Sequence, residues 1–258
     1  MAAAAADGQR EERPVVIEIA GVAGAGKSTL AANLAAVLST LGYAAEDSRS
    51  TRRGPHPFGR RLSARLRAFP ECARATAFVV GRIARRDLPL AALSRLGPAY
   101  QHSRQLRLLV GKLGAAGIVV QEPGWLMDLL TQYVHAKRPL TPKTARRYIE
   151  AGPRVDFAVI LRAGPEAALR HMRARKRGLP KSFRKLDAAA LTALLRQGDR
   201  CSATIADACR AVGIDTIEID VDLLDGDAVT ARCTDFLAAP LARRLGASEV
   251  QAIRRDRF

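Results

Sequence analysis

Short apolar runs alternate along the chain with longer stretches in which apolar residues recur at the spacing of a helix. The short runs are rich in β-branched residues and predict strands. We expect these strands over residues 15–20, 43–46, 117–121, 156–161 and 214–220. Because helical stretches separate the strands, the pattern predicts an α/β fold with a parallel sheet and right-handed crossovers.

The longest helical stretch lies between the second and third strands and is predicted to be a helical insertion over residues 58–116. Within it, helices are expected over 58–69, 71–86, 89–96 and 98–116. Outside it, helices are expected over 27–40, 126–137, 141–151, 166–177, 187–212 and 227–237.

The two ends of the chain differ from this pattern. Residues 1–13 are alanine-rich and then polar, and they are predicted to be a disordered leader. Residues 14–240 form the predicted domain, and residues 241–258 are predicted to be a basic, solvated C-terminal helix. No run approaches the roughly 18 apolar residues that a membrane span needs, so we expect no such span.

A glycine-rich loop connects the first predicted strand to the first predicted helix. It reads Gly-Val-Ala-Gly-Ala-Gly-Lys-Ser-Thr over residues 21–29 and fills every fixed position of the phosphate-binding loop motif. Glycines let successive backbone N–H groups turn toward one anion, and the helix N-terminus adds a positive dipole end. The predicted nucleotide-binding residues in this loop are Gly21, Ala23, Gly24, Ala25, Gly26, Lys27, Ser28 and Thr29.

Two side chains of the loop have predicted chemical roles. Lys27 is expected to reach the β- and γ-phosphates and is a candidate catalytic residue, and Ser28 is a candidate magnesium ligand. The alternative is a plain glycine turn with an incidental lysine. A dinucleotide-binding loop is disfavoured, because the glycines fall as GxxGxG and the Lys-Ser pair would have no role there.

Two acidic residues follow predicted strands. In parallel sheets ligands bind beyond the carboxyl ends of the strands, where Asp47, Glu122 and the glycine loop are all expected. Glu122 is a candidate magnesium ligand, directly or through water, or a base toward an acceptor hydroxyl, and Asp47 is the second candidate for these roles. The alternative for Glu122 is a surface acid that opens a Pro-Gly turn.

Arginines are clustered at two places. Arg170, Arg173 and Arg177 share one face of a predicted helix, where their planar forks would suit phosphate. We expect Arg170 to bind nucleotide, and we expect Arg173 and Arg177 to neutralise charge during phosphoryl transfer, unless the helix is simply solvated. Arg49, Arg52 and Arg53 are candidates for binding an anionic acceptor.

Composition and net charge exclude fewer classes of function than the motifs do. The 258-residue chain has a net charge of +17, which favours an anionic ligand or a compositional bias spread over solvated helix faces. Its four cysteines form no CxxC pair, so we expect free, buried thiols in a reducing cytoplasm.

Several of these features together resemble the P-loop nucleoside and nucleotide kinases, closest to the thymidylate kinase and deoxynucleoside kinase branch. They are the strand–GxxGxGKST–helix unit, the long helical insert, an apolar strand that ends in an acid, and the arginine-rich helix after residues 156–161. The resemblance covers roughly residues 15–220, and sharp motif identity is confined to the loop. It implies a three-layer P-loop NTPase fold with a five-stranded sheet of order 2-3-1-4-5.

The same resemblance implies ATP and Mg²⁺ as cofactors and an arginine-rich lid over ATP within residues 166–186. Glu122 stands where the family has an acid that is usually followed by arginine, whereas Pro123 follows here. The family's acidic residue after the second strand corresponds to Asp47 or Glu46.

We therefore predict an ATP-dependent phosphotransferase that acts on a small acceptor, a nucleoside or nucleoside monophosphate above all. The alternatives are a kinase of polynucleotides or other non-nucleotide acceptors, and a P-loop ATPase regulator. A polynucleotide partner ranks lower because aromatic residues, which stack on bases, make up only 5% of the chain. A guanine-specific GTPase is disfavoured, since the chain has no Asn/Thr-Lys-x-Asp sequence. The sequence leaves open whether the protein forms a homodimer.

Overall fold

The computed structural model describes residues 13–52, 58–114, 117–136, 138–174, 178–180 and 183–245, with the backbone alone at 51, 52, 58–67, 71, 91 and 95. The predicted leader up to residue 12, the tail from 246 onward, Arg53 and Arg177 therefore lie outside the described residues.

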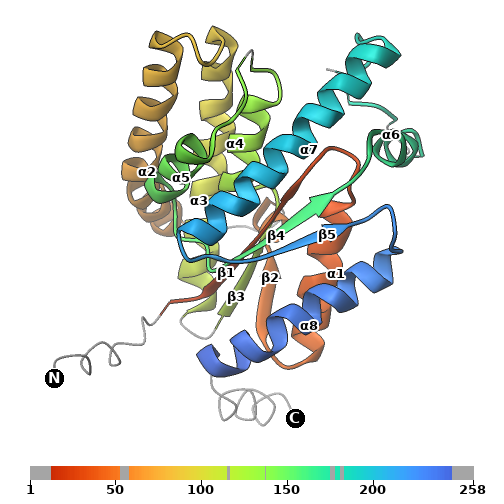
Figure 1. The fold of residues 1–258 in the computed structure, drawn as a ribbon. Helices are drawn as coiled ribbons and strands as arrows, with labels where there is room; N and C mark the ends of the chain where they lie inside the picture. The colour runs from red at the N-terminus through yellow and green to blue at the C-terminus, as the bar shows by residue number, and fades with distance from the viewer. Residues whose placement is uncertain are drawn as a thin grey trace, which may run out of the picture.

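The five strands of the core form one parallel sheet (Figure 1). They are β1 (Val15–Gly21), β2 (Ala44–Asp47), β3 (Gly117–Gln121), β4 (Phe157–Arg162) and β5 (Asp215–Asp220). Their order is β2-β3-β1-β4-β5. The predicted sheet and the strand order implied by the family resemblance are both confirmed.

Helices cover both faces of the sheet. The helices are α1 (Lys27–Thr40), α2 (Phe58–Ala84), α3 (Leu96–Leu113), α4 (Trp125–Tyr133), α5 (Pro142–Ala151), α6 (Pro165–Arg173), α7 (Ala188–Ala211) and α8 (Gly226–Leu245). Two 3₁₀ helices are η1 (Ser48–Arg52) and η2 (Leu90–Arg95). One face packs on α1 and α8, and the other packs on α3, α4 and α7, which gives the three predicted layers (Figure 1).

β1 is buried along its whole length because it is the central strand and both of its faces are covered. Its alternate residues Ile17 and Ile19 join the core under α1 and α8, whereas Val16 and Ala20 join the clusters on the opposite face. Glu18 lies in the same strand with no exposed surface, next to Gln121 of β3 in the register. A carboxyl group therefore sits inside the most buried strand of the fold.

The predicted break between two helices at Pro70 was wrong. The helices expected over 58–69 and 71–86 are one helix, α2, with Pro70 inside it. Proline removes one intrahelical hydrogen bond, but Ala68, Ala75 and Val79 form a buried stripe that continues across Pro70. Packing of this stripe in the tertiary structure overrides the local penalty.

The last helix differs in the same way. It was predicted to end at residue 237, before a solvated tail, but α8 continues through Pro240 to Leu245. Leu237, Leu241 and Leu245 are buried at intervals of four residues, so this stripe also crosses a proline. Leu241 and Leu245 thus belong to the core.

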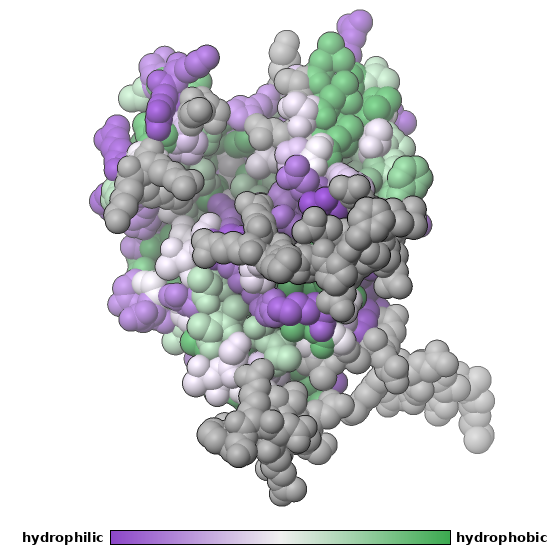
Figure 2. All heavy atoms as spheres, turned by 180° about the vertical axis from the view of Figure 1, so that it is seen from behind, coloured by the Kyte–Doolittle hydropathy of each residue, from purple (hydrophilic) through white to green (hydrophobic). Residues whose placement is uncertain are grey.

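Other surface and thiol predictions can be compared directly. All four cysteines are free, and Cys201, Cys209 and Cys233 are buried, whereas Cys72 is partly exposed. Within the described residues, no helix combines the length and apolar character that crossing a membrane requires. Figure 2 shows hydrophobic side chains gathered at the upper right of one face of the molecule. In the helical insertion, Phe69 and Leu90 are 68% and 73% exposed.

Candidate active site

The glycine loop between β1 and α1 lies against two other parts of the chain. Gly21 has φ of 144°, and a Cβ there would lie 2.1 Å from the carbonyl oxygen of Leu161 in β4. Gly24 has φ of 93°, and a Cβ there would lie 2.4 Å from the carbonyl oxygen of Ala168 in α6. The loop therefore needs glycine at both positions, for backbone conformation and for space.

The N-terminus of α1 has no side-chain cap. Gly26 is the N-cap in the left-handed conformation, and no side chain accepts a hydrogen bond there. The amides of Thr29 and Leu30 both donate to the Gly26 carbonyl oxygen at 3.0 Å. An uncapped helix N-terminus beside a glycine loop is a site for an anion, because the helix dipole and N–H groups favour negative charge.

Lys27 extends back into the curve of the loop. Its Nζ donates to the carbonyl oxygens of Gly21 and Val22, at 2.9 and 2.7 Å, and the residue is 8% exposed. The ammonium group is thus held on loop carbonyls, close to where the loop would hold phosphate.

Ser28 and Glu122, which the sequence predicted as magnesium ligands, are in contact. Ser28 Oγ donates to Glu122 Oε2 at 2.9 Å, although the two residues are 94 positions apart. Ser48 fixes the backbone of Glu122, because its hydroxyl donates to the Glu122 carbonyl oxygen at 3.0 Å and accepts from the Glu122 amide at 3.1 Å. The glycine loop and the end of β3 therefore form one site.

Asp47 lies at the end of β2, and its carboxylate is already paired. Arg49 Nε donates to Asp47 Oδ2 at 2.7 Å, and the same guanidinium donates to the Ser28 carbonyl oxygen at 2.6 Å. The pKa of Arg49 is raised, first by the hydrogen bond to Asp47 and further by the charges of Asp47 and Glu122. The structure thus places a permanent positive charge next to both acids. Glu46 instead pairs with Lys112 of α3 and accepts from Ser50.

The predicted lid arginines are only partly described. Arg170 and Arg173 are exposed on α6, and Arg177 lies outside the described residues. α6 itself packs on the loop, since His171 Nδ1 lies 3.2 Å from the Gly24 carbonyl oxygen. The arginine-rich lid and its closure therefore stay predictions.

Two cavities flank the loop. One, of about 240 Å³, is lined by loop residues Ala25, Gly26 and Thr29 and by the segment after β5 that includes Leu224 and Asp225. The other, of about 170 Å³, lies beside Val22 and Ala23 between α4 and α7 and is mostly apolar. A ligand bound at the loop therefore has space to extend into either cavity.

A metal ion at this site would depend on oxygen ligands. Within the described residues no group of three His, Cys, Asp or Glu side chains is arranged to hold a metal. The hydroxyl of Ser28 and the carboxylate of Glu122 are hard oxygen ligands at contact distance, which fits Mg²⁺ shared with phosphate and water. The site thus suits the magnesium complex of a nucleotide better than magnesium alone.

Behind the site, between the sheet, α3, α4 and α5, lies a buried polar cluster. His102 Nδ1 lies 3.0 Å from Asp128 Oδ2, and both residues are almost fully buried. The hydroxyls of Ser103 and Tyr148 and the side-chain amide of Gln132 are buried in the same region. The side chain of Gln132 interacts with the Tyr148 hydroxyl, and Ser103 interacts with the Cys72 thiol. Burial raises the pKa of Tyr148 well above its ordinary value. These buried polar groups thus interact with one another inside the core.

Sequence reasoning missed two residues of this region. Ser48 carries no motif, and its signal is its position directly after Asp47 at the end of a strand. Glu18 was assigned only to a strand, although a lone acid in a β-branched run is an unusual core residue. Its Oε1 accepts from the amides of Leu126 and Met127, at 2.5 and 3.3 Å, and so holds the N-terminus of α4.

Replacing Gly24 with alanine is expected to destabilise the loop and weaken nucleotide binding at least tenfold. The added Cβ would clash with the Ala168 carbonyl oxygen and force a side chain into φ of 93°, which together cost on the order of 1–3 kcal/mol. Urea unfolding and calorimetric titration with MgATP measure both effects. Gly81→Ala is the matched control, because its Cβ would meet nothing within 4 Å. Equal ATP affinity in the two variants would contradict the expectation.

The chain has structural matches among known proteins but no sequence match. No protein-family model and no curated protein sequence matches the chain. Among solved structures, one match is deoxyadenosine kinase from M. mycoides with bound dATP, at 14% identity and a TM-score of 0.48. The alignment covers 86% of this chain and 98% of that one. The strand order and the loop, seen in this chain itself, give it the fold of the P-loop nucleoside and nucleotide kinases.

Proposed function

We propose that this protein is a kinase that transfers the γ-phosphoryl group of ATP to a small acceptor, a nucleoside or nucleoside monophosphate. The observation that carries the proposal is the contact of Ser28 with Glu122 at the uncapped N-terminus of α1. It joins a phosphate-binding element to an acid that can serve the metal or the acceptor, and a glycine turn alone would not need this pairing.

The donor phosphates are bound by the loop. Amide groups of the loop and the ammonium of Lys27 would surround the β- and γ-phosphates, and Ser28 and Glu122 would hold Mg²⁺. When bound there, the ion neutralises charge on the phosphate oxygens. The nucleobase of ATP fits the cavity of about 240 Å³, because this cavity begins at Thr29 and is closed by apolar residues such as Leu224.

The acceptor approaches Glu122 from the side of α3 and α4. Its polar groups would use the buried His102–Asp128 pair and the hydroxyl groups nearby. Arg49 replaces the arginine that the kinase family usually has after the strand-ending acid, because its guanidinium lies between Ser28 and Asp47. An anionic acceptor would therefore meet a positive charge supplied from β2 rather than from β3.

During transfer, Glu122 would hold Mg²⁺ or accept the proton of the acceptor hydroxyl, and Asp47 would act through Arg49. Arg170 and Arg173 close over the phosphates from α6, which already packs on Gly24. Such closure excludes water that would otherwise hydrolyse ATP.

The test is a screen of ATP consumption with nucleosides, nucleoside monophosphates, sugars and single-stranded polynucleotides as acceptors. We expect one class of nucleoside or monophosphate to raise ATP consumption above the rate without acceptor. Glu122→Gln should lower kcat at least 100-fold with little change in ATP affinity, because it removes a charge needed in the transition state. Glu150→Gln, on the exposed surface of α5, is the control.

Other outcomes separate the alternatives. Stimulation by polynucleotide alone, with binding that weakens steeply as salt increases, would replace the small acceptor with nucleic acid and would agree with the net charge of +17. ATP hydrolysis that no acceptor stimulates would support an ATPase regulator instead.

A further inference from the structure

Glu18 caps the N-terminus of α4 although it belongs to β1. The N-cap residue of α4 is Gly124, which has no side chain that could accept a hydrogen bond. Glu18 Oε1 supplies the acceptor, because the amides of Leu126 and Met127, the second and third residues of the helix, donate to it at 2.5 and 3.3 Å. These are the two amides that an N-cap side chain normally satisfies. A strand residue thus replaces the missing cap of this helix.

The carboxyl group of Glu18 also lies against the turn that leads into α4. A Cβ on Gly124 would lie 2.5 Å from Glu18 Cδ and 2.6 Å from Oε1, so the backbone passes directly over the carboxyl group. Only Pro123, whose ring restricts φ, separates Gly124 from Glu122. Gln121, the residue before Glu122, is the neighbour of Glu18 in the β1–β3 register. Glu18 therefore lies beside the chain on both sides of Glu122.

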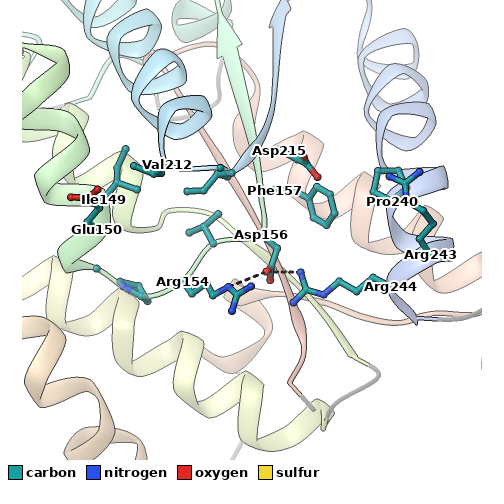
Figure 3. Close-up of a pocket in the computed structure, with 15 residues that line it drawn as sticks. Ile149, Glu150, Arg154, Asp156, Phe157, Val212, Asp215, Pro240, Arg243 and Arg244 are labelled. Atoms are coloured by element: carbon teal, nitrogen blue, oxygen red, sulfur yellow. Dashed lines mark ion pairs between the residues drawn. The ribbon is translucent and has the colours of Figure 1, made fainter. Parts of the chain in front are cut away.

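A second buried acid, Asp156, is held in a different way. Arg13 and Arg244 donate to it at 2.6 and 2.5 Å, and in Figure 3 Arg154 and Arg244 approach it from opposite sides. Burial alone would raise the pKa of Asp156, but hydrogen bonds from Arg13, a backbone amide and Arg244 lower it. The hydrogen bonds of Glu18 come instead from amides of α4. These contacts indicate that Glu18 is buried to hold the helix.

Glu122 is thus supported from two neighbouring strands. On the side of β2, the Ser48 hydroxyl bonds to the carbonyl oxygen and the amide of Glu122. On the side of β1, Glu18 holds the turn and the first amides of α4 that follow Glu122. The contact of 2.9 Å between Ser28 Oγ and Glu122 Oε2 depends on where this segment lies.

From this geometry we propose that Glu18 is a positioning residue for phosphoryl transfer, which keeps Glu122 in contact with Ser28 by holding the N-terminus of α4. Its part in catalysis rests on the proposed function, whereas its effect on the place of Glu122 does not. Glu18 itself contacts neither the nucleotide nor the metal in this arrangement.

This support should depend on pH. Burial raises the pKa of Glu18 to about 8, the α4 amides lower it, and the charge of Asp128, which contacts His102 of α3, raises it. Tyr148 of α5 and Cys209 of α7 also face Glu18, and burial raises the pKa of both, so both are neutral at pH 8. Above pH 8 Glu18 releases its proton to solvent. The buried carboxylate then has to admit water or move away, and either change loosens the turn.

Crystal structures of Glu18→Leu and Glu18→Gln without nucleotide test the positioning directly. Leucine has a similar size and no acceptor, so α4 loses its cap and we expect Ser28 Oγ and Glu122 Oε2 to separate beyond hydrogen-bond distance. Glutamine keeps an oxygen acceptor, so the contact should remain. A retained contact in Glu18→Leu would overturn the inference, whether or not the protein is a kinase.

A pH titration followed by two-dimensional NMR covers the case in which Glu18→Leu does not fold. In the wild-type protein the backbone amide signal of Glu122 should move between pH 7 and 9 as Glu18 ionises. In Glu18→Gln, which has nearly the same shape and does not titrate, the signal should stay in place. Equal behaviour of the two proteins would contradict the coupling of Glu18 to Glu122.

Kinetics with the acceptor found in the screen separate positioning from stability. Glu18→Leu should lower kcat at least tenfold with little change in KM for ATP, and Glu18→Gln should restore kcat at pH 7. Thr141→Val is the matched control, because it removes the side-chain cap of α5, which accepts from the Thr144 amide at 3.3 Å. It should lower the unfolding temperature and leave kcat unchanged. An unchanged kcat in folded Glu18→Leu would refute the catalytic part of the proposal.

The pH profile of kcat completes the test. The wild-type value should fall above pH 8, whereas that of Glu18→Gln should not, and identical profiles would count against the proposal. If no acceptor stimulates ATP consumption, the proposed function fails, and the crystal structures and the NMR titration still decide whether Glu18 positions Glu122.

Discussion

Replacing Lys27 with methionine is expected to lower kcat/KM for phosphoryl transfer by on the order of 10³-fold. Methionine keeps most of the unbranched side chain and removes only the ammonium group, to which the proposed function assigns the β- and γ-phosphates. In the structure this group is held by the carbonyl oxygens of Gly21 and Val22 and takes no part in the apolar core. The fold should therefore survive the change.

The measurement is a coupled assay of ADP release with the acceptor found in the screen, together with circular dichroism and thermal unfolding. Lys143→Met, at an exposed position in α5, is the matched control and should leave kcat/KM unchanged. Unaltered turnover in Lys27→Met, with the fold intact, would remove the loop from the mechanism.

Replacing Glu18 with glutamine is expected to stabilise the protein by about 3 kcal/mol at pH 7. Burial is the main reason that the pKa of Glu18 is raised to about 8, against hydrogen bonds from α4 amides that lower it. The folded protein thus retains a proton that the unfolded chain releases above its ordinary pKa of 4.5. Stability should fall by about 1.4 kcal/mol per pH unit between pH 4.5 and 8, and no further above pH 8.

Glutamine resembles the protonated carboxyl group in shape and can still accept hydrogen bonds from Leu126 and Met127 through its oxygen. It does not titrate, so the free energy of unfolding of Glu18→Gln should lose this dependence on pH. Urea unfolding from pH 5 to 9 measures this free energy for the variant and for the wild type. Glu150→Gln, at an exposed position, should keep the wild-type slope. A Glu18→Gln slope equal to that of the wild type would show that Glu18 is ionised in the folded state.

Most of the fold could be predicted from the sequence because its signals are local. A β-branched run such as residues 117–121 has the length of a strand and ends in turn residues, and the loop at 21–29 has a fixed spacing that needs no partner. Helix ends were less secure at Pro70 and Pro240. There, buried stripes on both sides of a proline outweigh its local penalty, and a stripe is recognised as buried only when its partner helix is known.

The sequence by itself determined the α/β alternation, the phosphate-binding loop and the position of acids at strand ends, since each depends on neighbouring residues. Only the tertiary structure decided which acid meets the loop. It put Glu122 on Ser28, turned Asp47 to Arg49, and directed Glu46 to Lys112. It also buried Glu18 and brought Arg13, Arg154 and Arg244 to the carboxylate of Asp156. These pairings join residues far apart in the chain, and strand order and helix packing, which no local pattern records, bring them together.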